Sequence, residues 1–179
     1  MKKTILALAL LVLTAGALSA FDTTALQLSI WAPKVQLVPP EIAVGFLKLN
    51  LPYGSNYQVT GIDLGLVSIN NSQGDELPAE VTGFQLNLWN ATDGNFAGAQ
   101  IGLINIADNS YGLEIGLGNI AATTSSGCAI GLVNVSHEFN GLEVGLVNYT
   151  EFLRGVQIGL VNVAIRSTLP FFPIINMCF

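Results

Sequence analysis

Carboxylate and amide side chains recur at one fixed place in a repeated phrase of this sequence. Paired carboxylates can carry out general acid–base chemistry when the pKa of one is tuned against that of the other. Amides separate most of the acids here, so a tuned catalytic pair is disfavoured. The pattern favours instead a polar face or lumen, lined by Asp63, Gln85, Gln100, Glu114, Glu143 and Gln157.

Other reactive residue types are scarce. His137, the single histidine, stands in the turn-like segment VSHEFNG, where a solvated loop residue is expected, and a Ser-His-Asp triad would need it. Cys128 and Cys178 are too few for a zinc site, which takes three or four ligands. They either pair in an oxidising compartment, or Cys128 fills an apolar repeat position. The sequence therefore predicts no enzyme, cofactor or metal site.

The phrase that carries the polar residues occurs seven times. Successive copies begin 22, 15, 14, 15, 14 and 14 residues apart. The first interval is long because of an Asn-, Gly- and Pro-containing insert at 70–80, which is typical of a loop. The copies begin at Gly61, Gly83, Gly98, Gly112, Gly127, Gly141 and Gly155.

Each copy alternates with the period of a β-strand. The sixth copy places Leu142, Val144, Leu146 and Asn148 on one face, and a Gly/Glu/Gly/Val set on the other. Glycine every four residues would cost about 1 kcal/mol each in a helix interior, so a helix is disfavoured. With further strand-like stretches at 26–30 and 45–51, we expect an all-β chain of about ten strands.

Two architectures fit a unit of 14 or 15 residues. Strands of about ten residues joined by tight hairpins would give an antiparallel sheet, curled or closed into a small barrel, with Leu and Ile toward lipid and the polar row in a lumen. The alternative is a β-solenoid with one unit per coil, Leu and Ile inward, and a ladder of stacked asparagines. The ladder would comprise Asn90, Asn105, Asn119, Asn134, Asn148 and Asn162.

Composition indicates export and an apolar environment. Residues 1–20 have the charged start, apolar run and small-residue end of a signal peptide, which leaves one β-repeat domain at 21–179. That domain keeps four basic and twelve acidic residues, so nucleic acid is an unsuitable partner. The chain is 51% hydrophobic and only 10% charged, with a mean hydropathy of +0.57. We expect membrane or envelope association, with any protein partner unknown.

The repeat GLxxGLxN resembles that of bacterial surface-repeat proteins of the leptospiral type. The segments LSIWAPKVQLVPP, FLKLNLPYGSNYQVTGIDLGLV and LPFFPIIN extend this resemblance over most of the mature chain. GFQLNLWN departs from it by placing Asn87 where glycine is usual. The resemblance implies an exported, surface-associated protein with no established activity. We therefore expect an outer-membrane or cell-surface protein with a structural or binding role; a narrow pore and a periplasmic location are the alternatives.

Overall fold

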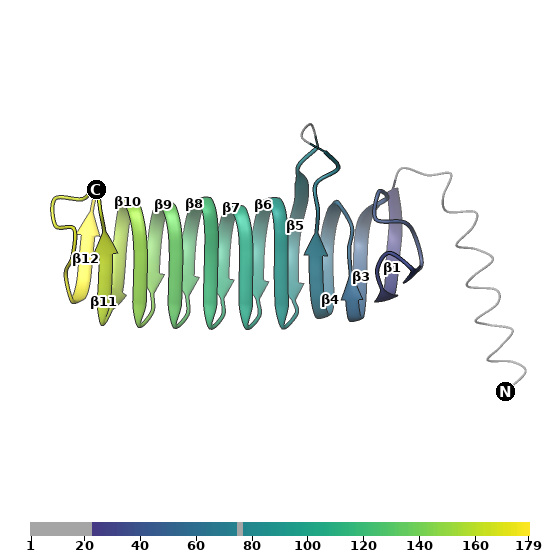
Figure 1. The fold of residues 1–179 in the computed structure, drawn as a ribbon, viewed down its shortest axis with the longest axis horizontal. Coiled ribbons are helices and arrows are strands. Elements are labelled where there is room, and N and C mark those ends of the chain that lie inside the picture. Colours follow the sequence, from purple (N-terminus) through teal and green to yellow (C-terminus); the bar gives the residue numbers. More distant parts are fainter. Residues whose placement is uncertain (1–22, 75–76) are drawn as a thin grey trace, which may run out of the picture.

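The chain forms a stack of β-coils that wind around one long axis (Figure 1). The structure is a computed structural model that describes residues 23–74 and 77–179. The signal peptide predicted for residues 1–20 lies outside the described residues. In the described part, no helix has the length and apolarity needed to cross a bilayer.

Twelve strands make up the described sheet. Their bounds are β1 Thr23–Trp31, β2 Val35–Gln36, β3 Ala43–Gly54, β4 Gln58–Asn70, β5 Ala79–Leu86, β6 Trp89–Ile101, β7 Ile104–Ile115, β8 Gly118–Ile130, β9 Val133–Val144, β10 Val147–Gly159, β11 Val161–Ala164 and β12 Ile174–Cys178. The loop predicted within residues 70–80 lies between β4 and β5, as expected.

Successive repeats pair in parallel and in register. Gly98 of β6 lies beside Gly112 of β7, which lies beside Gly127 of β8. Each unit of 14 or 15 residues therefore returns to its own starting point one layer further along. The result is a β-solenoid of about eight turns. The all-β prediction is confirmed, and the solenoid alternative describes the fold. The antiparallel sheet closed into a barrel is wrong, because the units do not form hairpins.

A single strand supplies most of each coil. In β7, residues 104–107 form one face and residues 110–115 form the other, with the register shift of a bend between them. Gly116 and Leu117 then turn the chain into β8. The solenoid is thus a flattened tube with two lengthwise edges. We call the one at the Gly-Leu turns the leucine edge, and the one at the mid-strand bends the polar edge.

The first glycine of each repeat is required by both backbone conformation and close packing. Gly127 has φ +126°, a region that side-chain-bearing residues rarely adopt. A Cβ at this position would lie 2.1 Å from the carbonyl oxygen of Gly112 in the preceding coil. The same geometry recurs along this row, so the coils touch backbone to backbone here.

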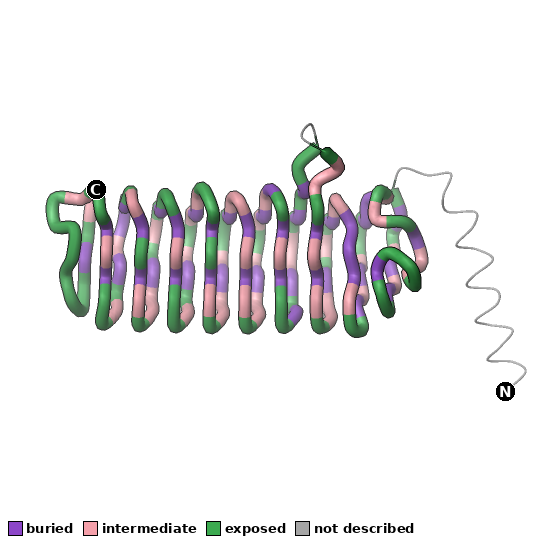
Figure 2. Tube along the Cα trace, viewed as in Figure 1, coloured by how far each residue is buried: buried purple, intermediate pink, exposed green. Residues whose placement is uncertain are grey.

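Buried and more exposed positions alternate along each coil (Figure 2). Most of the buried residues are polar, and many large apolar residues are exposed. Within β7, Asn105 and Glu114 are buried, whereas Leu113 and Ile115 face outward and are partly exposed. The expectation that a solenoid would turn its Leu and Ile inward is therefore wrong. The strand alternation is real, but the polar face is the inner one.

Most of the larger buried apolar side chains lie in one interior row near the polar edge. Val44, Val59, Val81 and Phe96 pack together toward the N-terminal end, and Phe139 and Leu153 pack toward the C-terminal end. Between these clusters, Ser110 and Ser125 occupy the same row. The centre of the solenoid therefore has little apolar packing and depends on hydrogen bonds between side chains.

Both ends of the stack carry an antiparallel strand. At the N-terminal end, β2 pairs antiparallel with β1. At the C-terminal end, β12 pairs antiparallel with the second half of β10, because β11 covers only its first half. These strands interrupt the parallel repeat and cover part of the open sheet edge at each end.

Candidate functional site

The six polar residues singled out from the sequence form one buried row inside the solenoid. In-register pairing aligns them along β4 to β10, with Ala129 between Glu114 and Glu143. None has more than 3% of its surface exposed. The row begins beside Lys48 and is interrupted once, at Ala129. Its members are Asp63, Gln85, Gln100, Glu114, Glu143 and Gln157.

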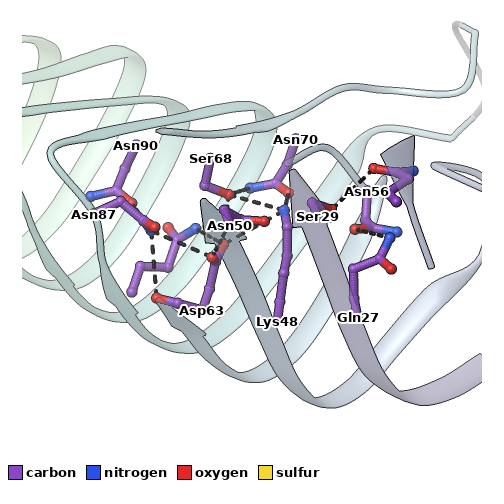
Figure 3. Close-up of polar contacts among 12 residues, drawn as sticks. Gln27, Ser29, Lys48, Asn50, Asn56, Asp63, Ser68, Asn70, Asn87 and Asn90 are labelled. Carbon is purple, nitrogen blue, oxygen red and sulfur yellow. Dashed lines mark hydrogen bonds and ion pairs between the residues drawn. The ribbon is translucent and has the colours of Figure 1, made fainter. Parts of the chain in front are cut away.

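An ion pair closes the N-terminal end of this row (Figure 3). The Lys48 Nζ lies 3.7 Å from the Asp63 Oδ2, and both side chains are fully buried. Nζ also donates hydrogen bonds to the Ser68 hydroxyl at 3.0 Å and to the Asn70 Oδ1 at 2.6 Å. Burial lowers the pKa of Lys48, and the carboxylate of Asp63 opposes that shift. All three neighbours of Nζ accept, which suits a charged ammonium group.

The Asp63 carboxylate is held by further donors. Its Oδ1 accepts a hydrogen bond from Asn50 Nδ2 at 2.6 Å, and its Oδ2 accepts one from the Ser68 hydroxyl at 2.6 Å. Gln85 Nε2 also donates to Oδ2, at 3.0 Å. A buried carboxylate is stable only when its lone pairs are satisfied in this way. This cluster is therefore a self-contained, charge-balanced unit.

Amide side chains continue the row away from the ion pair. Gln100 Nε2 donates to Gln85 Oε1 at 3.0 Å, repeating the contact that Gln85 makes with Asp63. The donors of these two amides thus point toward the N-terminal end of the stack. Their carbonyl oxygens face the other way, toward Glu114 in the case of Gln100.

Two acids without a cation occupy the second half of the row. Glu114 Oε2 accepts a hydrogen bond from the Ser125 hydroxyl at 3.1 Å, and Glu143 Oε2 accepts one from Gln157 Nε2 at 2.7 Å. Burial raises the pKa of Glu114, against the effect of nearby hydroxyls. Burial also raises the pKa of Glu143 to about 8, and the proximity of Glu114 adds to that shift.

A second row is the asparagine ladder predicted for a solenoid. Each Asn donates one amide hydrogen to the Oδ1 of the next Asn at 2.7–2.9 Å. The same nitrogen reaches a backbone carbonyl of the leucine-edge turn, as Asn119 does with Ile130 at 3.0 Å. The second glycine of each repeat makes room for the ladder. A Cβ at Gly116, for example, would lie 2.9 Å from Asn105 Nδ2.

Asn87 shows why the second glycine of the repeat is absent once. The coil before Asn90 carries Ser68 at the ladder position, so no ladder asparagine donates to Asn90 from that side. Asn87 replaces the missing donor, with its Nδ2 2.7 Å from Asn90 Oδ1. The same nitrogen lies 3.4 Å from Asp63 Oδ1. The departure from the repeat thus connects the two interior rows.

The outer surface separates apolar from charged side chains. The leucines of the leucine edge are 40–67% exposed, and uncharged, mostly apolar residues flank them on both faces. From β3 to β11, no exposed charge of the described residues lies on the leucine edge or the faces beside it. The leucines of this edge are Leu66, Leu88, Leu103, Leu117, Leu132, Leu146 and Leu160.

The solvent-accessible charged side chains of these coils lie along the opposite edge. They are Glu80, Asp93, Asp108, Glu138, Glu151 and Arg154. A surface hollow of about 400 Å³ opens beside this edge, where β8, β9 and β10 present polar side chains next to Phe152. His137 lies at the same edge, with its Nδ1 3.5 Å from the Glu151 Oε2, and is substantially exposed, as the sequence suggested.

The two cysteines face different environments. Cys128 lies in an outward row, in register with Leu113 and Leu142. Cys178 of β12 packs against the buried cluster that contains Phe139 and Leu153. Both thiols are free. The alternative in which Cys128 fills an apolar repeat position therefore describes the structure, and the disulfide is absent from it.

Sequence reasoning missed Lys48 as a member of the buried row. The register of β3 against β4 pairs Lys48 with Asp63 and Leu49 with Leu64. Alignment of GFLKLNL with the first repeat, TGIDLGL, would have revealed the equivalence. It was obscured because this segment lacks the paired glycines that mark the later repeats.

Comparison with known proteins gives no further identification. No family model, curated protein or solved structure matches the chain. The resemblance to leptospiral-type surface-repeat proteins therefore stays a prediction.

Proposed function

We propose that this chain is an exported cell-envelope repeat protein that attaches to the outer membrane along its leucine edge. The observation that carries the proposal is the uncharged, apolar surface that follows this edge and extends onto both faces. Exposed apolar patches of this extent mark membrane or protein contacts in other proteins. The polar edge then remains in water, available for a structural or binding role.

The shape of the apolar surface favours lipid over a single protein partner. It wraps around a convex edge, whereas one flat partner could cover only one face. Acyl chains can follow such a surface, as they do for interfacial amphipathic helices. The backbone is suited to this contact, because hydrogen bonding between coils satisfies the N–H and C=O groups along the length of the stack.

The position of the leucine edge predicts how the solenoid is oriented relative to the membrane. The leucine edge runs parallel to the solenoid axis, so contact along the whole edge places that axis in the membrane plane. About eight turns at ~4.8 Å each give a contact line of roughly 38 Å. The packed, hydrogen-bonded interior gives no support to the alternative of a narrow pore. Exposed acids outnumber exposed bases, so attraction to anionic headgroups contributes little.

Vesicle flotation tests the proposal. We expect the purified protein to float with phosphatidylcholine vesicles, and the fourfold variant Leu103→Ser, Leu117→Ser, Leu132→Ser, Leu146→Ser to stay at the bottom of the gradient. A matched control is Tyr111→Ser with Phe152→Ser, which removes exposed aromatic surface near the polar edge and should still float. Circular dichroism verifies that each variant keeps its β structure.

Two results would contradict the proposal. One is a wild-type protein that remains soluble and monomeric in buffer and never floats. The other is a fourfold leucine variant that floats as well as the wild type while the aromatic control does not. Fractionation of producing cells with surface protease treatment tests the cellular part, since an outer-membrane location predicts cleavage at the polar edge in intact cells.

A further inference from the structure

Two buried acceptor oxygens on adjacent coils, one on Gln100 and one on Glu114, lack a hydrogen-bond donor. The two residues are register partners on adjacent coils. Gln100 Oε1 and Glu114 Oε1 are both buried, and neither has a hydrogen-bond partner among the described residues. Because the Gln100 amide nitrogen is already turned toward Gln85, it cannot supply the missing donor. Two acceptor oxygens brought close together in this way repel unless a hydrogen lies between them.

A proton on Glu114 would supply that hydrogen. A neutral carboxylic acid donates through one oxygen and accepts through the other. Glu114 Oε1–H would then donate to Gln100 Oε1, while Oε2 continues to accept from the Ser125 hydroxyl. This arrangement extends the donor direction of Gln85 and Gln100 by one more coil.

Glu143 is also buried, and among the described residues it forms no ion pair that would stabilise a carboxylate. A void lies between Glu114 and Glu143 where Ala129 replaces the longer side chain of the row, and it is too small to hold a water molecule. Ser136 lines it, with a hydroxyl that has no partner in the described part of the chain. A calcium ion would need six to eight oxygen ligands, more than these side chains provide.

The other charged groups on the neighbouring strands do not reach the two acids. On β6, β8 and β10 the inward residues beside them are Gln100, Ala129 and Gln157. Cys178 of β12 packs on the same interior from the C-terminal end. Lys48 is already paired with Asp63, with two glutamines between that pair and Glu114. The remaining charges of β6 to β10 lie at the polar edge: Asp93, Asp108, His137, Glu138, Glu151 and Arg154.

We propose that Glu114 and Glu143 are held in the folded protein as neutral carboxylic acids, and that loss of their protons at raised pH opens the coils from β7 to β10. The interior is then electrically neutral, with Lys48 and Asp63 as its only opposite charges among the described buried residues. The inference concerns the core and does not depend on the proposed membrane attachment.

The direction of the pH effect follows from proton linkage. Burial raises the pKa of Glu143 from 4.5 to about 8, so between these values the unfolded chain has released its proton and the folded chain retains it. The contribution of these protons to the free energy of unfolding is therefore greatest below pH 4.5. It falls as the pH rises and is lost above about pH 8. Each retained proton makes the unfolding equilibrium constant rise by up to about tenfold per pH unit.

Isosteric replacement of the acids tests the proposal. Equilibrium unfolding of the full chain by urea is measured across this pH range for the wild type, Glu114→Gln, Glu143→Gln and the double variant. Glu114→Gln presents an amide N–H to Gln100 Oε1 and cannot ionise. We expect it to resemble the wild type at acidic pH and to have an unfolding constant at least about tenfold lower above pH 8. Glu138→Gln, an exposed change on β9, should keep the wild-type pH slope.

Infrared spectroscopy of the folded wild type gives a second readout that does not depend on any variant folding. We expect a protonated-carboxyl C=O band at neutral pH that disappears on alkaline titration. Wild-type and double-variant proteins with the same pH slope, or a neutral-pH spectrum without that band, would overturn the proposal. Stabilisation of the wild type by added calcium, reversed by a chelator and absent from the double variant, would overturn it in favour of a bound cation.

Discussion

At the scale of single residues, the interior depends on polar side chains that are satisfied by one another. Asn119 illustrates this: it accepts from Asn105, and its amide nitrogen donates to both Asn134 and the Ile130 carbonyl. A buried polar group that loses its partner costs about 1–3 kcal/mol. Each ladder residue therefore stabilises two neighbours, and substitutions in the middle of a row should cost more than substitutions at its ends.

The Lys48–Asp63 pair gives a residue-scale prediction. Lys48→Met should lower the free energy of unfolding by about 3–5 kcal/mol, because it leaves the buried Asp63 carboxylate without its cation. Adding Asp63→Asn to that variant should recover much of the loss, since the neutral amide removes the unpaired charge. Urea unfolding monitored by circular dichroism measures both values.

The matched control for this prediction is Lys34→Met, which removes an exposed lysine near the N-terminal end of the stack. It should change stability very little. If Lys48→Met is as stable as the wild type, or if the double variant is less stable than the single one, the account of the ion pair is incorrect.

At the scale of the strand, the repeat is defined by backbone contact as much as by side chains. The first glycine of each unit places one coil against the next, and the second leaves space for the asparagine ladder. A strand such as β7 bends across the polar edge without ending, which keeps the parallel hydrogen-bond ladder on both faces. These local demands explain why glycine recurs inside strands that it would otherwise weaken.

Two glycines of β8 provide a paired test of this element. Gly127→Ala combines backbone strain, worth ~1–3 kcal/mol, with a Cβ 2.1 Å from a backbone oxygen. We expect it to lower the unfolding free energy by more than about 3 kcal/mol. Gly118→Ala meets only the tip of Ile104, at 3.3 Å, and should be tolerated. Thermal unfolding measures the stability of both variants. An equal loss of stability in Gly127→Ala and Gly118→Ala would show that close contact between the coils is unimportant.

The sequence predicted strands, the repeat length, the loop before β5 and the asparagine ladder. It did not determine which face is inside, because period-two alternation is equally clear from both sides. The leucine-edge turn also changes the alternation. The alternation places Asn148 on the face of Leu142, yet Asn148 is buried with Glu143, since Gly145 and Leu146 turn the chain between them. The bend at the polar edge lies inside a continuous strand, so the sequence alternation is not interrupted there. The alternation therefore could not distinguish a solenoid coil from a β-hairpin.

At the scale of the whole molecule, the solenoid reverses the usual distribution of polar and apolar side chains. Hydrogen-bonded amides and acids stabilise the inside, so the outward Leu, Ile and Val rows are available to contact another apolar phase. The reversal connects the two proposals of membrane contact and proton-dependent stability, because both require the polar row to be the core.

Thiol accessibility at positions 128 and 129 tests this central claim most directly, because the two neighbours point to opposite sides of β8. In a Cys178→Ala background, native Cys128 is compared with a variant that combines Cys128→Ala and Ala129→Cys, whose new thiol points into the interior of the solenoid. We predict that N-ethylmaleimide in mild detergent modifies the thiol at 128 readily and the one at 129 only after unfolding. Rapid modification at 129 with protection at 128 would show that the Leu and Ile rows face inward, and would contradict the account.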